Sequence, residues 1–343
     1  MANTNEIILP DLLAQWPFET NPNPLQNIVA DSAAWVESFE AFSPRAQIAF
    51  NLCKFGIFSS LAYATAGPGH FRAACDLMNL FFVFDEKSDE ASGQEVAQQA
   101  ADIMRALRRK HSWSHDEKVN HLRGLSNLKA ESVFDSAFWK RTLLVASQSS
   151  AQRFIKHFDE YTDAVRQQAV DRETGHLRSI SGYLQLRRGT IGVRPSFDFF
   201  LLTDDLPDSA VDHPHIERLA CGAIDMTILA NDLYSYNVEQ SRGDDEHNLI
   251  TVAMKEKNFS VQQAVDHVGE KYLHISRAFC EDMKNLPIFP DPVNNLVKEY
   301  ATGMALWVYT NIKWSFASQR YFGRDGPAIE KHRRVRLLAP AEK

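Results

Sequence analysis

Apolar residues recur three and four positions apart along most of the chain, and this periodicity constrains the fold more than any other feature. One example runs through Ile48, Leu52, Phe55, Phe58 and Ala62. Such spacing puts apolar side chains on one face of an α-helix. A sustained alternation of period two, which is typical of strands, is hard to find, and the sequence has only 15 glycines. The pattern therefore predicts an all-α fold.

Short breaks divide this pattern into helical stretches of roughly 15 to 25 residues. The breaks fall at 67–69, 92–93, 111–115, 204–214, 243–245 and 287–292. They are too short to be domain linkers. We therefore expect one helical domain over residues 31–325. A proline-rich arm, residues 1–30, is expected to pack on this domain, and residues 326–343 are expected to form a basic C-terminal tail.

Composition and charge exclude several classes of function. The chain has 37 Lys and Arg against 44 Asp and Glu, a net charge of −7, which argues against binding to nucleic acid. An anionic ligand would therefore need a local site. The four cysteines form no CxxC pair, and His111 and His115 lie in a charged stretch typical of a solvated helix end, so no zinc site is expected. Without a signal peptide or an apolar run of 18 residues, a cytoplasmic location with no transmembrane segment is expected.

The first candidate site follows a strongly apolar helical stretch. There the motif D-E-x-x-D begins at Asp85 and ends at Asp89. On a helix, Met78, Phe81, Phe82 and the two aspartates share one face. Magnesium prefers carboxylate oxygens together with substrate phosphates and water, so Asp85 is the best ligand candidate and Asp89 a helper. By itself this motif is weak evidence, because acidic pairs four residues apart are more often found on solvated helix faces.

A second motif is more specific. Asn231, Ser235 and Glu239 are spaced at i, i+4 and i+8, so an amide oxygen, a hydroxyl and a carboxylate lie on one side of a helix. All three are oxygen ligands that suit one hard cation. Ile224 and Ile228 continue the same face, which indicates the wall of a cavity and not a solvated surface. This motif predicts a metal site.

Two segments supply arginines, whose rigid guanidinium suits phosphate oxygens. In the first, Arg188 precedes a helix break that Gly192 helps to make, which would expose backbone groups. In the second, Arg320 and Tyr321 follow the end of a helix near the C-terminus. Trp307 and Trp314 are seven residues apart in that helix and share a face. Without the metal motifs, such arginines are more often surface residues and such tryptophans core residues.

The order of these motifs along the chain resembles the class I terpene synthases of microbial type. The sequence around these motifs is similar to that of mushroom sesquiterpene synthases. The similar parts include the segments that begin at Ser43 and at Cys75, and the run Asn237-Val238-Glu239-Gln240. The resemblance covers nearly the whole chain. It implies one helical bundle around a central apolar cavity. It also implies three Mg²⁺ ions, for which Mn²⁺ can substitute, that bridge two motifs to an isoprenoid diphosphate.

The resemblance also implies a role for each matching residue. Metal ligands would be Asp85 and Asp89 on one side, and Asn231, Ser235 and Glu239 on the other. The diphosphate would be sensed by Arg188 and bound by Arg320 and Tyr321, and the Gly192 carbonyl would assist ionisation. The substrate-binding residues would be Phe81, Phe82, Arg188, Asn231, Trp307, Trp314, Arg320 and Tyr321. Two positions depart from the family pattern, namely Lys87 inside the acidic motif and Gly189 after the arginine pair.

We therefore expect a carbon–oxygen lyase acting on farnesyl diphosphate, and also on geranyl diphosphate, as a monomer or homodimer. Its product would be cyclic, through a 1,11-closure, or a linear alcohol such as nerolidol or linalool. A chain-elongating prenyltransferase is the nearest alternative, although it would carry a second aspartate-rich motif. A helical interaction protein without catalysis explains the helices but not the ordered motifs. The absence of DxDD disfavours a class II cyclase.

Overall fold

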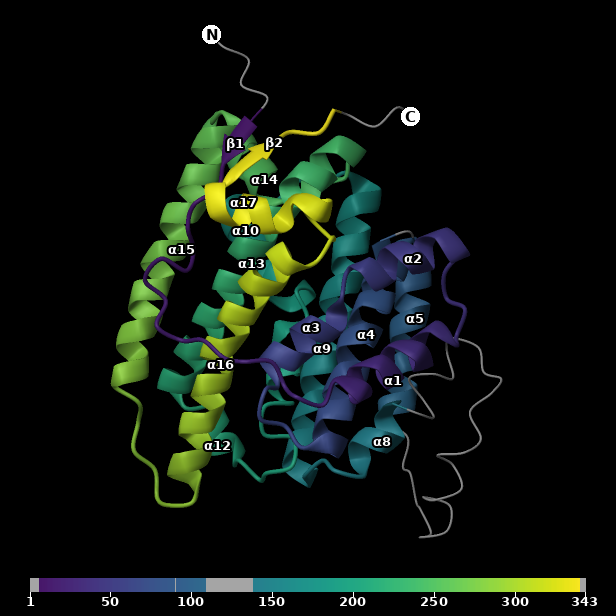
Figure 1. The fold of residues 1–343 in the computed structure, drawn as a ribbon, viewed down its shortest axis with the longest axis vertical. Helices are drawn as coiled ribbons and strands as arrows, with labels where there is room; N and C mark the ends of the chain where they lie inside the picture. The colour runs from purple at the N-terminus through teal and green to yellow at the C-terminus, as the bar shows by residue number, and fades with distance from the viewer. Residues whose placement is uncertain (1–5, 90, 109–137, 340–343) are drawn as a thin grey trace.

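A computed structural model describes residues 6–89, 91–108 and 138–339, and its architecture confirms the predicted all-α fold (Figure 1). His111 and His115 lie outside the described residues. The helices in chain order are α1 (Gln26–Glu37), α2 (Pro44–Leu52), α3 (Phe55–Ala62), α4 (Pro68–Asp89), α5 (Gly93–Arg108), α8 (Trp139–Leu143), α9 (Gln148–Thr174), α10 (Ile180–Thr190), α11 (Val193–Phe197), α12 (Asp208–Val211), α13 (Pro214–Arg242), α14 (Leu249–Lys257), α15 (Val261–Lys284), α16 (Val293–Ala317) and α17 (Gly326–His332). Two short 3₁₀ turns, η2 (Asp245–His247) and η3 (Gly323–Asp325), and two strands, β1 (Glu6–Ile8) and β2 (Arg334–Arg336), complete the fold.

Local sequence signals set the ends of the helices. Ser147 and Ser260 are N-caps whose hydroxyls accept hydrogen bonds from backbone N–H groups of the first turn. Gly243 ends α13 in the left-handed conformation, with φ 77°, which glycine adopts at no steric cost. The break predicted at 243–245 therefore separates α13 from α14 as expected.

The long helices form a bundle with α13 at its centre. α13 packs against α15 and α16, and also against α10, while α9 packs against α5 and α10. In Figure 1, α15 and α16 form one side of the bundle, and α4 and α5 form the other. Among the described residues, no helix combines the length and the apolar composition that a membrane crossing requires.

The two ends of the described chain are joined by a short strand pair, which the sequence did not predict. β1 pairs with β2 in antiparallel register, with Ile7 opposite Val335, and both side chains are buried. Asn237 of α13 donates a hydrogen bond to the carbonyl of Arg336 (3.0 Å). The arm also contains the first residues of α1, which begins at Gln26. Because three-residue strands lack a detectable periodicity, long-range pairing of this kind leaves no local signal.

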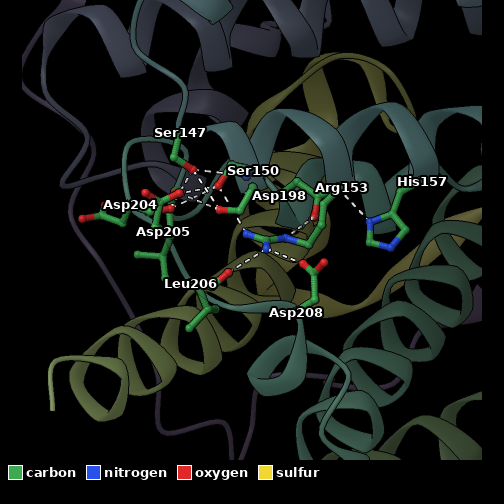
Figure 2. A network of polar contacts seen from close by, with 11 residues as sticks. Ser147, Ser150, Arg153, His157, Asp198, Asp204, Asp205, Leu206 and Asp208 are labelled. Atoms are coloured by element: carbon green, nitrogen blue, oxygen red, sulfur yellow. Dashed lines mark hydrogen bonds and ion pairs between the residues drawn. The ribbon is translucent and has the colours of Figure 1, made fainter. Parts of the chain in front are cut away.

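A buried polar network fixes α9 to the segment that follows α11 (Figure 2). His157 Nδ1 lies 2.8 Å from Asp198 Oδ2, and burial raises the pKa of the Asp198 carboxyl. Arg153 donates to the carbonyl of Leu206 (2.7 Å) and to Asp208 Oδ1 (2.8 Å). The network therefore holds the chain directly after the α10–α11 break against α9.

Asp198→Ala is expected to lower the free energy of unfolding by about 3 kcal/mol, because it leaves His157 and Arg153 buried beside a lost carboxylate. Denaturant unfolding followed by circular dichroism measures this change. The control is Asp205→Asn. Asp205 is exposed and accepts a hydrogen bond from the Ser149 hydroxyl (2.9 Å), so its change should stay within about 0.5 kcal/mol. Equal stability of the two variants would show that the network contributes nothing.

Candidate active site

A cavity of about 460 Å³ lies between α4, α13, α16 and the break between α10 and α11. One part of its wall is apolar and aromatic, and another part carries charged and oxygen-bearing groups. The apolar part includes Phe58, Met78, Phe81, Phe82, Tyr161, Ile191, Val193, Trp307 and Trp314. The polar part includes Asp85, Glu86, Asp89, Arg172, Arg187, Asn231, Ser235, Glu239, Arg242, Arg320 and Tyr321. All residues of the two proposed metal motifs are therefore brought to one cavity.

The last turns of α4 present the first acidic motif. Met78, Phe81, Phe82, Asp85 and Asp89 all line the cavity, as the helical spacing predicts. The aromatic rings are fixed from behind: Phe82 stacks on Phe55 with centroids 3.8 Å apart, and Phe81 meets Tyr161 edge to face. The two aspartates therefore stand at the rim of an aromatic wall.

The second motif lies on α13, and Asn248 orients it. The Asn248 amide donates to Glu239 Oε2 (2.9 Å) and lies 3.3 Å from Ser235 Oγ. Burial raises the pKa of Glu239, while the hydrogen bond from Asn248 opposes this rise. Behind this layer, burial raises the pKa of Asp232 to about 7, opposed by the nearby Arg187 guanidinium and the Tyr183 hydroxyl. The motif is thus prearranged before any ligand binds.

The paired arginines point in different directions, and the one assigned from the sequence as diphosphate sensor, Arg188, is not the one that lines the cavity. Arg188 forms a bidentate pair with Asp225 (2.7 and 2.8 Å), its side chain is 46% exposed, and it does not line the cavity. Arg187 does line the cavity and donates to Asn231 Oδ1 (2.7 Å) and Thr190 Oγ1 (3.2 Å). Of the two adjacent arginines, Arg187 is therefore the one that lies at the site.

Hydrogen bonds join the two motifs through the C-terminal arginine and tyrosine. Arg320 donates to Glu86 Oε1 (2.9 Å) and to Asp85 Oδ2 (3.1 Å) on α4. The adjacent Tyr321 hydroxyl accepts from the Asn231 amide of α13 (2.9 Å). The segment after α16 consequently bridges the two sides of the cavity mouth.

Gly192 lies at the helix break, as predicted, with φ 70°. A Cβ there would come within 3.2 Å of the Phe81 ring, so the position requires glycine for both its conformation and its close approach. Its carbonyl accepts a hydrogen bond from Ser196 Oγ (2.8 Å). The carbonyl that was expected to assist ionisation is thus already engaged in this structure.

The two departures from the family pattern lie away from the cavity. A Cβ on Gly189 would come within 2.5 Å of the Ala164 Cβ, so glycine is needed where α10 packs on α9. Lys87 is exposed and its ammonium lies 5.1 Å from the centroid of the Phe42 ring. Neither residue lines the cavity.

Sequence reasoning missed three residues that shape the site. Arg172 of α9 lies 3.6 Å from Asp89 and donates to the carbonyls of Ser88 and Ala91, which end α4. Asn248 and Arg187 are the other two. A signal existed for Arg187, because its spacing to Tyr183 and Thr190 places all three on one helix face, whereas none existed for the long-range contacts of Arg172.

The donor set fits a hard divalent cation. Within the described ranges, no three His, Cys, Asp or Glu side chains gather tightly enough to hold a metal. Instead, carboxylates of α4 face the amide, hydroxyl and carboxylate of α13 across the same cavity. Such oxygen groups leave room for phosphate oxygens and water, which magnesium retains in its coordination shell.

Comparison with known proteins identifies the family. The model described as "Terpene synthase family 2, C-terminal metal binding" matches residues 76–274, more than half of the 343-residue chain. The chain belongs to this family. This terpene synthase is 40% identical to a Delta(6)-protoilludene synthase of Stereum hirsutum, over 99% of this chain and 95% of the relative. It is 39% identical to sesquiterpene synthase 9 of Postia placenta, over 97% of this chain and 94% of that relative.

Solved structures of terpene synthases share the fold. The a-eudesmol synthase superposes with a TM-score of 0.75 at 19% identity, covering 88% of this chain and 97% of that one. A linalool/nerolidol synthase from Streptomyces clavuligerus in complex with 2-fluorogeranyl diphosphate gives 0.73 at 17% identity, covering 86% and 100%. At these identities the likeness concerns the fold alone. The family assignment makes the chain an enzyme, so the hypothesis of a non-catalytic scaffold is discarded.

Proposed function

We propose that this terpene synthase ionises farnesyl diphosphate with the help of Mg²⁺, releases diphosphate and converts the carbocation to a sesquiterpene. One observation carries the proposal, namely that both oxygen-bearing motifs, together with Arg187 and Arg320, line one aromatic cavity. The relatives include a protein named as a sesquiterpene synthase, which favours the C15 substrate.

The proposed metal ligands are the residues of the two motifs. Asp85 and Asp89 would hold cations from α4, and Asn231, Ser235 and Glu239 would hold them from α13. Bound magnesium supplies positive charge that stabilises the departing diphosphate. Asn248 keeps Glu239 oriented for this role through its hydrogen bond.

Arg187, and not Arg188, is the proposed diphosphate sensor, together with Arg320 and Tyr321. Both arginines are now paired with motif residues, Arg187 with Asn231 and Arg320 with Asp85. A diphosphate between them would receive charge-assisted hydrogen bonds from both guanidinium groups where negative charge develops. The same side chains would thereby draw the two sides of the mouth together.

The apolar part of the cavity would fold the hydrocarbon chain and exclude bulk solvent. Phe81, Phe82, Trp307 and Trp314 present aromatic surface, and aromatic faces stabilise positive charge. A volume of about 460 Å³ lies within the usual range of ligand cavities, about 300 to 1,000 Å³. We propose that chain folding in this space sets the product, either a cyclic one through 1,11-closure or a linear alcohol.

Incubation of the purified protein with farnesyl diphosphate and Mg²⁺ is expected to release diphosphate and a C15 hydrocarbon or alcohol. EDTA should abolish the release, and Mn²⁺ should restore it. Gas chromatography with mass spectrometry, run also with geranyl diphosphate, identifies product and substrate preference. Consumption of isopentenyl diphosphate to give a longer diphosphate would instead establish the prenyltransferase alternative.

A further inference from the structure

Several polar side chains on the cavity wall already donate hydrogen bonds to other groups of the protein. Thr227 Oγ1 donates to the carbonyl of Ala223 (2.8 Å), one turn back in its own helix. The indole N–H of Trp314 donates to the carbonyl of Cys53 (2.8 Å). These groups have no free donor for a ligand in the cavity.

Asn311 and Trp307 differ from these residues. Both line the cavity and both are buried, with 5% and 4% of their surface exposed. Asn311 Nδ2 and Trp307 Nε1 have no hydrogen-bond partner among the described residues. An unpaired buried amide is costly, and native proteins rarely keep one without an unseen partner such as water.

The two groups are close to each other on α16. Because they are four residues apart, they share one face of the helix, one turn from each other. Asn311 lies six residues before the end of α16 at Ala317, about 9 Å along the helix axis. Arg320 at the cavity mouth lies beyond that end, so the pair sits on the hydrocarbon part of the wall and away from the proposed diphosphate site.

The chemistry of this pair suits one small oxygen-bearing molecule. A side-chain amide offers both a donor and an acceptor, and an indole offers a donor. A buried water molecule needs two to four such partners, and it is stable only where the site is polar. The surroundings include Phe58, whose ring lies against Trp307 with centroids 4.7 Å apart. The hydroxyls of Ser196 and Thr227, which also line the cavity, already donate to backbone carbonyls.

We propose that Asn311, with Trp307, holds a water molecule inside the cavity and directs this enzyme to an alcohol product. The inference rests on the proposed function and narrows its product class. The water oxygen forms a C–O bond with the cationic carbon, and the excess proton passes to the released diphosphate, which is the base formed in the same reaction. Asn311 is therefore the residue that determines whether the cation is hydrated or loses a proton.

The test compares wild type with Asn311→Leu in H₂¹⁸O, with Mg²⁺ and farnesyl diphosphate. Wild type is expected to yield an alcohol carrying ¹⁸O. In Asn311→Leu the ratio of labelled alcohol to hydrocarbon should fall about tenfold or more, because the water loses a hydrogen-bonding partner. Phosphatase-type cleavage of the P–O bond would leave the alcohol unlabelled. Gas chromatography with mass spectrometry measures the ratio, which does not depend on the total rate.

Thr310→Val is the matched control. Thr310 is the neighbouring residue on α16, it is fully buried and its hydroxyl also has no partner among the described residues, but it does not line the cavity. Its replacement should leave the product ratio unchanged. Because leucine replaces a buried amide that has no partner among the described residues with an apolar side chain of similar size, the melting temperature of Asn311→Leu should equal or exceed that of wild type. Asn311→Ala provides a second variant with the same expected fall in the ratio should the leucine variant fold poorly.

Each failure has a distinct signature. Diphosphate release by wild type without any labelled alcohol would overturn the water site while leaving the proposed function standing. An unchanged ratio in Asn311→Leu and Asn311→Ala would do the same. No diphosphate release by wild type would overturn the proposed function and this inference together.

Discussion

Arg187→Ala is expected to reduce diphosphate release from farnesyl diphosphate by about 100-fold or more, whereas Arg188→Ala should change it by less than about threefold. The two residues are adjacent in sequence and identical in chemistry. Only the first faces the cavity, where it contacts Asn231. Steady-state kinetics with a coupled diphosphate assay measure both effects.

The physical reason lies in the surroundings of each guanidinium. Arg187 is 19% exposed beside Asp232 and Asn231, so its charge is poorly screened and acts strongly on a diphosphate in the mouth. Arg188 is paired with Asp225 at the surface, where water screens the pair and its loss costs little. Arg187→Lys serves as a second variant, since it keeps the positive charge but loses the planar guanidinium that binds phosphate oxygens in a bidentate manner. It should recover part of the rate.

The opposite result would be informative. A severe loss in Arg188→Ala, together with near-normal activity in Arg187→Ala, would mean that α10 rotates when ligand binds. The position assigned from the sequence would then be the correct one, and the geometry of the cavity described above would not represent the active state.

The double change of Asn231 and Ser235 to alanine is expected to reduce activity by about 1,000-fold or more while the protein stays folded. It removes two of the three proposed oxygen ligands of α13, and the affinity of a site for Mg²⁺ depends on the number of its oxygen ligands. Calorimetric titration with Mg²⁺ and inorganic diphosphate should show that their joint binding is lost. Circular dichroism and the melting temperature verify folding.

Gln240→Ala is the matched control for this pair. Gln240 lies on the same helix, but its amide donates to the carbonyl of Leu338 on the other side of α13 and it does not line the cavity. Its kinetics and diphosphate binding should match those of wild type. Full binding in the double variant would refute the assignment of α13 as a metal-binding helix.

The sequence was sufficient to predict the features that depend on helix periodicity. The wall from Met78 to Asp89 and the row Asn231, Ser235 and Glu239 follow from spacings of three and four residues, and all of these residues line the cavity. The bundle itself followed from the same pattern. The break predicted at 243–245 likewise placed the end of α13 at Gly243.

The features that the sequence did not predict depend on contacts between distant segments. The choice between Arg187 and Arg188 depends on how α10 is rotated against α13. In this orientation Arg187 donates a hydrogen bond to Asn231, and Arg188 donates one to Asp225. The pairing of β1 with β2 joins residues more than 300 positions apart, and three-residue strands carry no periodic signal. Asn311 resembles any polar residue in a buried helix until its lack of a partner is seen.

A crystal structure with Mg²⁺ and inorganic diphosphate tests the central claim most directly. We expect metal ions held by Asp85 on one side and by Asn231, Ser235 and Glu239 on the other, with the diphosphate bound by Arg187 and Arg320. Diphosphate seated instead in the surface groove of Arg188, Lys257 and Lys271, with no ion between α4 and α13, would contradict it.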